Sequence, residues 1–270
     1  MKSVSLRVLG CGDAFGSGGR SHTAFCLDAP NTRLLIDFGA SALVSMRRLG
    51  IDPGIVDAVV LSHLHGDHFG GLPFLLLDAA FVTRRTRPLV IAGPSGTPDR
   101  LRRTTELLFP GFWRRHGRSH CQFIELVDRR PVSLAGATLT PFRVVHGSGA
   151  PAFALRVSCG GCTVAYSGDT AWTDALVEAA RDADLFLCEA SSFATPIPYH
   201  LTYQTVAAHR KDFRTARLVL THLGPEMLSR ASKLRLECAR DGQRIVVGPR
   251  STSNSERTCA APPRTRANRR

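Results

Sequence analysis

The chain has 270 residues, of which 43% are hydrophobic, so it can bury the core of one large domain. No run of eighteen apolar residues occurs, and the first ten residues lack the hydrophobic block of a signal peptide, so a cytoplasmic protein without a membrane partner is expected. The formal net charge of +13 favours anionic partners such as phosphates or nucleic acid, although a solvated, arginine-rich surface would give the same balance.

Strands dominate the start of the chain, and helical patterns follow them. Strands are predicted at Val4–Leu9, Ala24–Asp28, Arg33–Asp37, Asp57–Leu61 and Pro88–Ala92. Helices are predicted at Ser41–Leu49, Phe69–Val82 and Pro98–Phe109.

A second half is predicted to begin near Cys121. Its strands are predicted at Cys121–Val127, Val132–Leu134, Thr138–Val145, Ala152–Val157, Thr163–Tyr166, Leu185–Cys188, Leu218–Leu220 and Ile245–Val247, and its helices at Thr173–Asp182 and Thr202–Lys211. Strands are thus followed by helices twice, which predicts two sheets packed face to face with their helices outside.

The last stretch, from Arg250 to Arg270, holds six Arg against one Glu and has no periodicity. We therefore expect one domain over residues 1–248 and a disordered basic tail over residues 249–270.

One pair of the eight cysteines has the CxxC spacing, Cys159-Gly160-Gly161-Cys162. It lies between two predicted strands, and Gly-Gly suits a two-residue hairpin turn. The turn is favoured over a redox or zinc role because no second CxxC is present to complete a zinc site.

Residues 63–68 read His-Leu-His-Gly-Asp-His, directly after an apolar strand-like stretch. His63 and His65 are two residues apart, so they point to the same side of an extended segment. Asp67 and His68 come from the other side, where the chain turns toward a helix. Imidazole and carboxylate are ligands of Zn²⁺, Mn²⁺ and Fe²⁺. The pattern predicts two metal ions side by side, against the alternative of surface or structural histidines.

Two metal ions need further ligands, and three candidates follow predicted strands: His146, Asp169 and His222. Each has a glycine within two residues, which permits close approach of the backbone. A carboxylate at the end of a buried strand is costly unless it meets a cation. The alternative for Asp169 is a helix N-cap, and for the two histidines a structural role.

In this order the motifs resemble those of the metallo-β-lactamase superfamily, and in particular its branch of ribonuclease Z and related phosphodiesterases. They are HLHGDH at 63–68, His146, SGDT at 167–170 and THLG at 221–224, with LGCGD at 9–13, GGR at 18–20, LIDFG at 35–39 and HLT at 200–202. The similarity runs from about residue 4 to residue 248. It implies an α/β fold, the αββα four-layer sandwich of two mixed sheets with helices outside.

The resemblance also implies a ligand set for two divalent ions, with zinc first and manganese or iron as alternatives. One ion would be held by His63, His65 and His146, and the other by Asp67, His68 and His222. Asp169 would bridge the two ions together with a water or hydroxide.

By the same resemblance, the protein is a hydrolase of a phosphodiester in RNA or in a small nucleotide-like molecule, and relatives of this branch often form homodimers. The metal-bridging hydroxide would attack, Asp67 could orient it, and His200 would protonate the leaving oxygen with Glu189 as its orienting partner. The alternatives are hydrolysis of a carboxylic ester, lactone or thioester, and a metal-binding member without turnover.

One departure argues against a tRNA-processing enzyme. Ribonuclease Z proteins of that type usually carry a long tRNA-binding arm between the positions of His146 and Asp169. Here twenty-two residues intervene, and the predicted hairpin at Cys159–Cys162 fills them.

Overall fold

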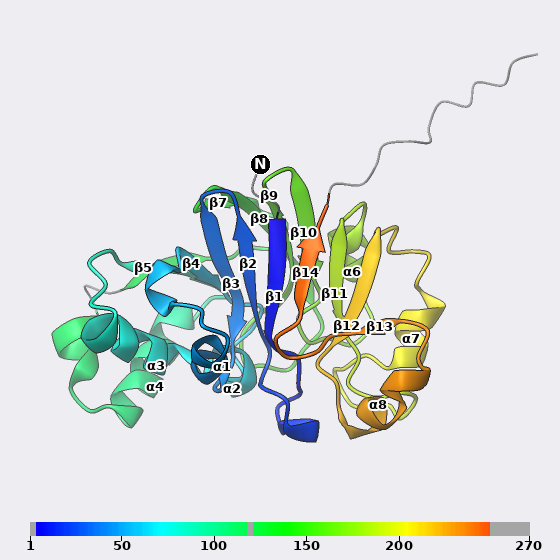
Figure 1. The fold of residues 1–270 in the computed structure, drawn as a ribbon, viewed down its shortest axis with the longest axis horizontal. Helices are drawn as coiled ribbons and strands as arrows, with labels where there is room; N and C mark the ends of the chain where they lie inside the picture. Colours follow the sequence, from blue (N-terminus) through cyan, green and yellow to red (C-terminus); the bar gives the residue numbers. More distant parts are fainter. Residues whose placement is uncertain (1–3, 118–120, 249–270) are drawn as a thin grey trace, which may run out of the picture.

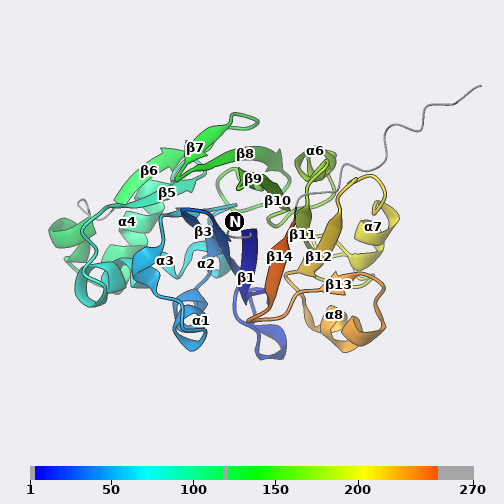
Figure 2. The same ribbon diagram turned by 45° about the horizontal axis from the view of Figure 1, so that its top comes forward.

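Residues 4–117 and 121–248, which the computed structural model describes, form four layers: two β-sheets packed face to face with helices on both outer sides (Figures 1 and 2). The first sheet has seven strands in the order β14-β1-β2-β3-β4-β5-β6, and the second has seven in the order β13-β12-β11-β10-β9-β8-β7. Both sheets contain parallel and antiparallel pairs. The predicted αββα sandwich is confirmed.

The strands of the first sheet are β1 Val4–Gly10, β2 Ala24–Ala29, β3 Thr32–Phe38, β4 Ala58–Val60, β5 Leu89–Gly93, β6 Cys121–Glu125 and β14 Arg244–Val247. Those of the second are β7 Val132–Leu134, β8 Ala137–Val144, β9 Ala152–Cys159, β10 Cys162–Tyr166, β11 Leu185–Glu189, β12 Arg217–Thr221 and β13 Glu237–Cys238. The α-helices are α1 Ala42–Arg48, α2 Gly66–Phe69, α3 Leu72–Leu77, α4 Thr97–Leu108, α6 Ala175–Ala180, α7 Tyr203–Ala208 and α8 Pro225–Arg230. Among the described residues, no helix combines the length and hydrophobicity needed to cross a bilayer.

Alternation along the strands produces the layers. In β3, Leu34 and Ile36 belong to the core between the sheets, whereas Leu35 packs under the outer helices of the first half. In β11, Leu187 faces the other sheet and Phe186 faces the helices of the second half. Each fully buried aliphatic or aromatic side chain contributes about 1.5–3 kcal/mol. A continuous apolar strand buried on both faces therefore specifies its place in the middle of the sandwich.

The predicted boundary between the halves is wrong. Strand β6 was expected to open the second sheet, but it pairs in parallel with β5, with Leu89 opposite Cys121. Strand β14 also returns to the first sheet and pairs with β1, with Val4 opposite Val247. The second sheet therefore begins at β7. The sheet that β6 or β14 joins cannot be predicted from the neighbouring residues, because a strand has the same hydrophobic alternation in either sheet.

The predicted helix at Phe69–Val82 is broken into three pieces. Helix α2 already begins at Gly66, α3 starts at Leu72, and a π-helical turn, η3, covers Asp78–Val82. The chain contacts the backbone of another segment at the junction of α2 and α3, because a Cβ at Gly71 would lie 2.4 Å from the carbonyl oxygen of Gly39. Helix α8 and strand β13 were not predicted.

The CxxC segment forms the predicted turn. Cys159 and Cys162 are opposite each other in the β9–β10 hairpin, and both are free thiols. Gly160 and Gly161 have φ angles of 55° and 76°, as a type I′ turn requires. The tail predicted at 249–270 lies outside the described residues.

The parallel strands at the centre of each sheet bring their carboxyl ends to one edge of the sandwich. β3 and β4 run parallel in the first sheet, and β10, β11 and β12 in the second. Loops at such an edge can turn inward from both sheets, and binding sites commonly form beside the carboxyl ends of parallel strands.

Gly39, directly after β3, allows the histidine-rich loop to approach, since a Cβ there would lie 2.1 Å from the carbonyl oxygen of Asp67. Gly39→Ala should lower the free energy of unfolding by at least about 1–3 kcal/mol, because backbone atoms must move apart. Gly66→Ala is the matched control, since Gly66 is the neighbour of Asp67 at the start of α2 and its Cβ would meet nothing within 4 Å. Thermal and urea denaturation would measure both variants, and equal stability of the two would contradict the prediction.

Candidate metal centre

Each side chain predicted as a metal ligand lies at this edge of the sandwich. His63 and His65 are in the loop after β4, and Asp67 and His68 are in α2. The remaining three directly follow or closely follow the second-sheet strands β8, β10 and β12, and they are His146, Asp169 and His222. The set falls into two clusters of potential ligand atoms.

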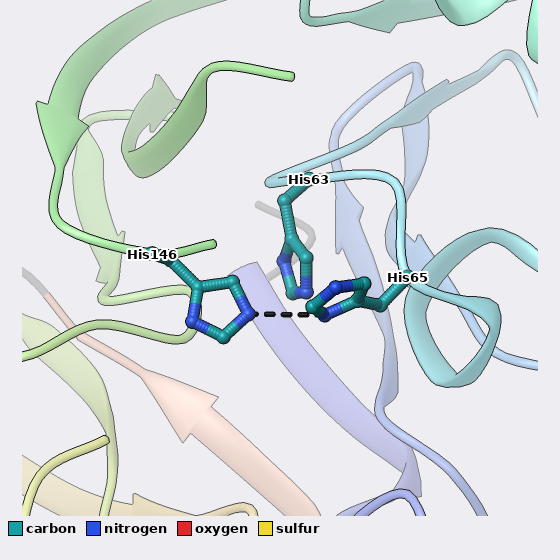
Figure 3. A group of neighbouring side chains, drawn as sticks. All are labelled: His63, His65 and His146. Atoms are coloured by element: carbon teal, nitrogen blue, oxygen red, sulfur yellow. Dashed lines mark hydrogen bonds between the residues drawn. The ribbon is translucent and has the colours of Figure 1, made fainter. Parts of the chain in front are cut away.

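The first cluster consists of three imidazole rings that converge on one point (Figure 3). His146 Nε2 lies 3.0 Å from His65 Nδ1. His63 Nε2 is fully buried and has no hydrogen-bond partner among the described residues. A buried nitrogen without a partner is costly, and a cation at the point of convergence would satisfy it.

The second cluster combines two carboxylates with two imidazoles. Asp169 Oδ2 lies 3.2 Å from Nε2 of both His68 and His222. Asp67 Oδ2 lies 3.3 Å from the same two nitrogens. Donor atoms that bind one tetrahedral ion at about 2.0–2.1 Å are themselves about 3.3 Å apart. The spacing of these atoms therefore matches that of ligands around one ion.

Asp169 joins the two clusters. Its Oδ2 is also 3.9 Å from His63 Nε2, and its Oδ1 is buried without a hydrogen-bond partner in the described part of the chain. The carboxylate of Asp169 thus lies between the two groups of imidazoles, and its Oδ1 is available to bind a cation. Taken together, the two clusters fit a dinuclear metal site.

The pKa shifts of the clustered histidines show how strongly the two carboxylates favour positive charge beside them. Burial would lower the pKa of His68, but Asp169 and Asp67 outweigh burial and raise it well above its ordinary value. For His222 burial also acts downward, and Asp169 leads the groups that raise its pKa to about 9. The carboxylates therefore favour positive charge at these rings, which a divalent cation would also supply. His63 is different, because burial and then His68 lower its pKa well below the usual range, which leaves it neutral.

Asp37, which was not among the predicted site residues, orients two of the predicted ligands. It is fully buried, and its Oδ2 lies 2.7 Å from His68 Nδ1 and accepts a hydrogen bond of 2.7 Å from Ser62 Oγ. Ser62 Oγ has then used its proton, so it accepts from His63 Nδ1 at 3.0 Å. Both rings therefore present Nε2 to the clusters. The signal was available, since Asp37 ends an apolar strand as Asp169 does.

A second carboxylate, Glu189 in β11, repeats this arrangement in the other sheet. Ser191 Oγ donates to Glu189 Oε2 at 2.8 Å and lies 3.1 Å from His222 Nδ1. His200 Nδ1 lies 3.0 Å from Glu189 Oε2. Burial lowers the pKa of His200, but its bond to Glu189 raises it above the ordinary value. His200 is thus held by Nδ1, and it lines a pocket over the clusters.

The pocket has a volume of about 400 Å³. Its lining includes His65, Asp67, Asp169, His200 and His222. His209, which belongs to none of these motifs, stacks on Trp172 with ring centroids 3.6 Å apart and is not in the pocket lining. His120 lies outside the described residues.

Comparison with known proteins gives a family match. The family described as "Anti-Pycsar protein Apyc1" matches residues 4–244 of this chain. A Mycobacterium tuberculosis protein, Rv1339, is 35% identical over 238 residues, covering 83% of this chain and 82% of the relative. A Bacillus subtilis protein named "Probable metallo-hydrolase YhfI" is 25% identical over 227 residues, covering 82% of this chain and 87% of its own length.

Solved structures give the same fold. The crystal structure of YhfI, a metallo-β-lactamase fold protein, superposes with a TM-score of 0.74 at 21% identity and covers 90% of this chain and 99% of its own. The short form of human tRNase Z has a TM-score of 0.74 at 25% identity and covers 90% of this chain and 99% of its own.

Asp37→Asn removes the negative charge that orients His68 directly and His63 through Ser62. We expect metal affinity to fall about 10–100-fold, as for other groups that hold a ligand in place. Titration of the metal-free protein with zinc against a competing chelator measures the effect. Asp128→Asn is the control, because Asp128 pairs with Arg129 in an exposed contact away from the clusters. Unchanged affinity in Asp37→Asn would rule out this role.

Proposed function

The chain belongs to the anti-Pycsar protein Apyc1 family, and from that membership and the paired clusters we propose that it is a metal-dependent phosphodiesterase that hydrolyses small cyclic nucleotides. The observation that carries the proposal is the cluster of two carboxylates and two imidazoles directly beside His200. Such a site suits an anionic substrate whose leaving group needs a proton.

We assign the ligands as the two clusters group them. His63, His65 and His146 would hold one ion, Asp67, His68 and His222 the other, and Asp169 would contact both. We propose zinc, with manganese and iron as alternatives, because the donors are imidazole nitrogens and carboxylate oxygens. Two ions so placed would lower the pKa of a water and stabilise charge on the phosphoryl oxygens.

His200 would act as the general acid. Its Nδ1 is bonded to Glu189, which leaves Nε2 free to face the pocket. The contact with Glu189 favours the protonated ring, and after the leaving oxygen takes the proton Glu189 would hold the neutral ring in the same orientation. General acid catalysis of this kind contributes typically about 10²–10⁴-fold.

Asp67 would orient the attacking water. Burial raises its pKa, but His68 and His222 outweigh burial and keep the pKa well below its usual range. The carboxylate is therefore ionised and can only accept hydrogen bonds. An acceptor at this position would direct a water lone pair toward the phosphorus atom.

The connection between the clusters favours a small substrate over tRNA. The twenty-two residues between His146 and Asp169 form a loop and the β9–β10 hairpin, without the long arm of tRNA-processing enzymes. No Lys or Arg is among the described residues that line the pocket. A polynucleotide needs several phosphate contacts, whereas one phosphodiester is served by the site itself.

Hydrolysis of a substrate panel tests the proposal. The purified protein should contain about two first-row metal ions per chain and should cleave 3′,5′-cyclic nucleotides faster than precursor tRNA, lactones or carboxylic esters. Removal of metal with a chelator should abolish the activity, and zinc or manganese should restore it. Faster cleavage of lactones or of precursor tRNA would contradict the proposal that the substrate is a cyclic nucleotide.

The role of His200 is tested through the leaving group. His200→Ala should slow hydrolysis of a cyclic nucleotide about 10²–10⁴-fold, because its alkoxide leaving group needs a proton. The same variant should affect bis(p-nitrophenyl) phosphate much less, since nitrophenolate leaves unprotonated. His209→Ala is the control, as His209 is outside the site. Equal losses on both substrates would count against the general acid.

A further inference from the structure

Phe15 is the most exposed of the large hydrophobic side chains in the described part of the chain, at 90% of its surface. It lies in the loop between β1 and β2, and it lines the pocket over the metal clusters. Burial of a phenyl ring is favourable in free energy, so a largely exposed ring beside a pocket indicates a surface that a ligand covers.

The loop that carries Phe15 is held in place. The buried carboxylate of Asp13 accepts hydrogen bonds from the backbone N–H groups of Phe15 at 3.2 Å and Ser17 at 3.0 Å, and from Ser17 Oγ at 2.7 Å. At its base the loop is tied to the segment of His222, because the N–H of Leu223 donates to the carbonyl oxygen of Cys11 at 3.2 Å. Phe15 is therefore exposed by a defined turn, and little ordering is left for a ligand to impose.

The pocket has two chemically different ends. One end is polar and includes His65, Asp67, Asp169 and His222 of the clusters together with His200. The apolar lining of the pocket comes from two loops and the start of α8: Ala14, Phe15, Ile197, Pro198 and Pro225. A ligand that matches both ends carries an anion at one end and a flat apolar ring at the other.

We propose that Phe15 is a specificity-determining residue whose ring stacks on the nucleobase of the substrate while the phosphodiester lies on the clusters. This inference rests on the proposed function and adds the way in which the nucleoside is bound. Since every base has a π-face, stacking selects for a base without selecting which base. Stacking on Phe15 would not distinguish purine from pyrimidine cyclic nucleotides, so both should be accepted.

The test compares substrates with and without a base. KM and kcat would be measured for uridine and adenosine 3′,5′-cyclic monophosphates and for methyl riboside 3′,5′-cyclic phosphate, which lacks a base. Phe15→Ala should raise KM for both cyclic nucleotides about tenfold, within the range for loss of one base–aromatic stack, and should change kcat little. Its effect on the base-free substrate should be about twofold or less, because no stack is lost there. Phe15→Trp should restore the KM of wild type.

Leu107→Ala is the matched control, since Leu107 on α4 is 82% exposed and lies away from the pocket. It should behave as wild type on all three substrates. An equal change on base-free and base-bearing substrates, or no change in Phe15→Ala, would overturn the inference. So would a shift of Phe15→Ala from dimer to monomer in light scattering with no substrate dependence, because Phe15 would then pack against a second copy. If wild type cleaves no phosphodiester, the proposed function has failed first, and the inference falls with it.

Discussion

Three buried carboxylates hold this edge of the molecule together. Asp37 and Glu189 are fully buried, and Asp169 is 2% exposed. An ionised carboxylate without compensation is too costly at such positions. Each of the three therefore meets imidazole rings from a different part of the chain, and the loops of both sheets are drawn to the same edge by this requirement.

Asp37 and Glu189 use the same arrangement from opposite sheets. Each ends a parallel strand, each is bonded to the hydroxyl of a neighbouring serine, and each binds one ring directly and a second through that serine. In the first sheet both rings belong to the proposed metal ligands, whereas in the second one ring is His200. The same hydrogen-bonding logic thus orients ligands on one side and the proposed acid on the other.

The backbone accepts strain to make this possible. Asp37 and His222, which are not glycines, have φ angles of 53° and 55°. Left-handed conformations of such residues cost about 1–3 kcal/mol and persist only where the surroundings over-determine them. Here the contacts between buried carboxylates and imidazoles hold Asp37 and His222 in these conformations. The polar residues of the clusters contrast with the apolar part of the pocket lining, which includes Phe15, Ile197 and Pro198.

Much of the site was predictable from local patterns. The spacing of His63, His65, Asp67 and His68 was read from six consecutive residues, and His146, Asp169 and His222 were selected because each follows an apolar strand. Strand and helix positions followed from hydrophobic alternation, which depends only on neighbouring residues. The layered fold was inferred from the order of the elements and supported by a family resemblance.

Ligand type and hydrophobic periodicity are local properties, so the candidate metal ligands and most strands could be predicted from neighbouring residues alone. The sheet that β6 and β14 join became clear from the folded structure, since strand pairing is set by contacts distant in sequence. It also placed Asp37 in direct contact with His68 and in contact with His63 through Ser62, and it placed Phe15 in the lining of the pocket. A buried acid and an exposed aromatic residue look ordinary in a sequence, and their surroundings in three dimensions make them functional candidates.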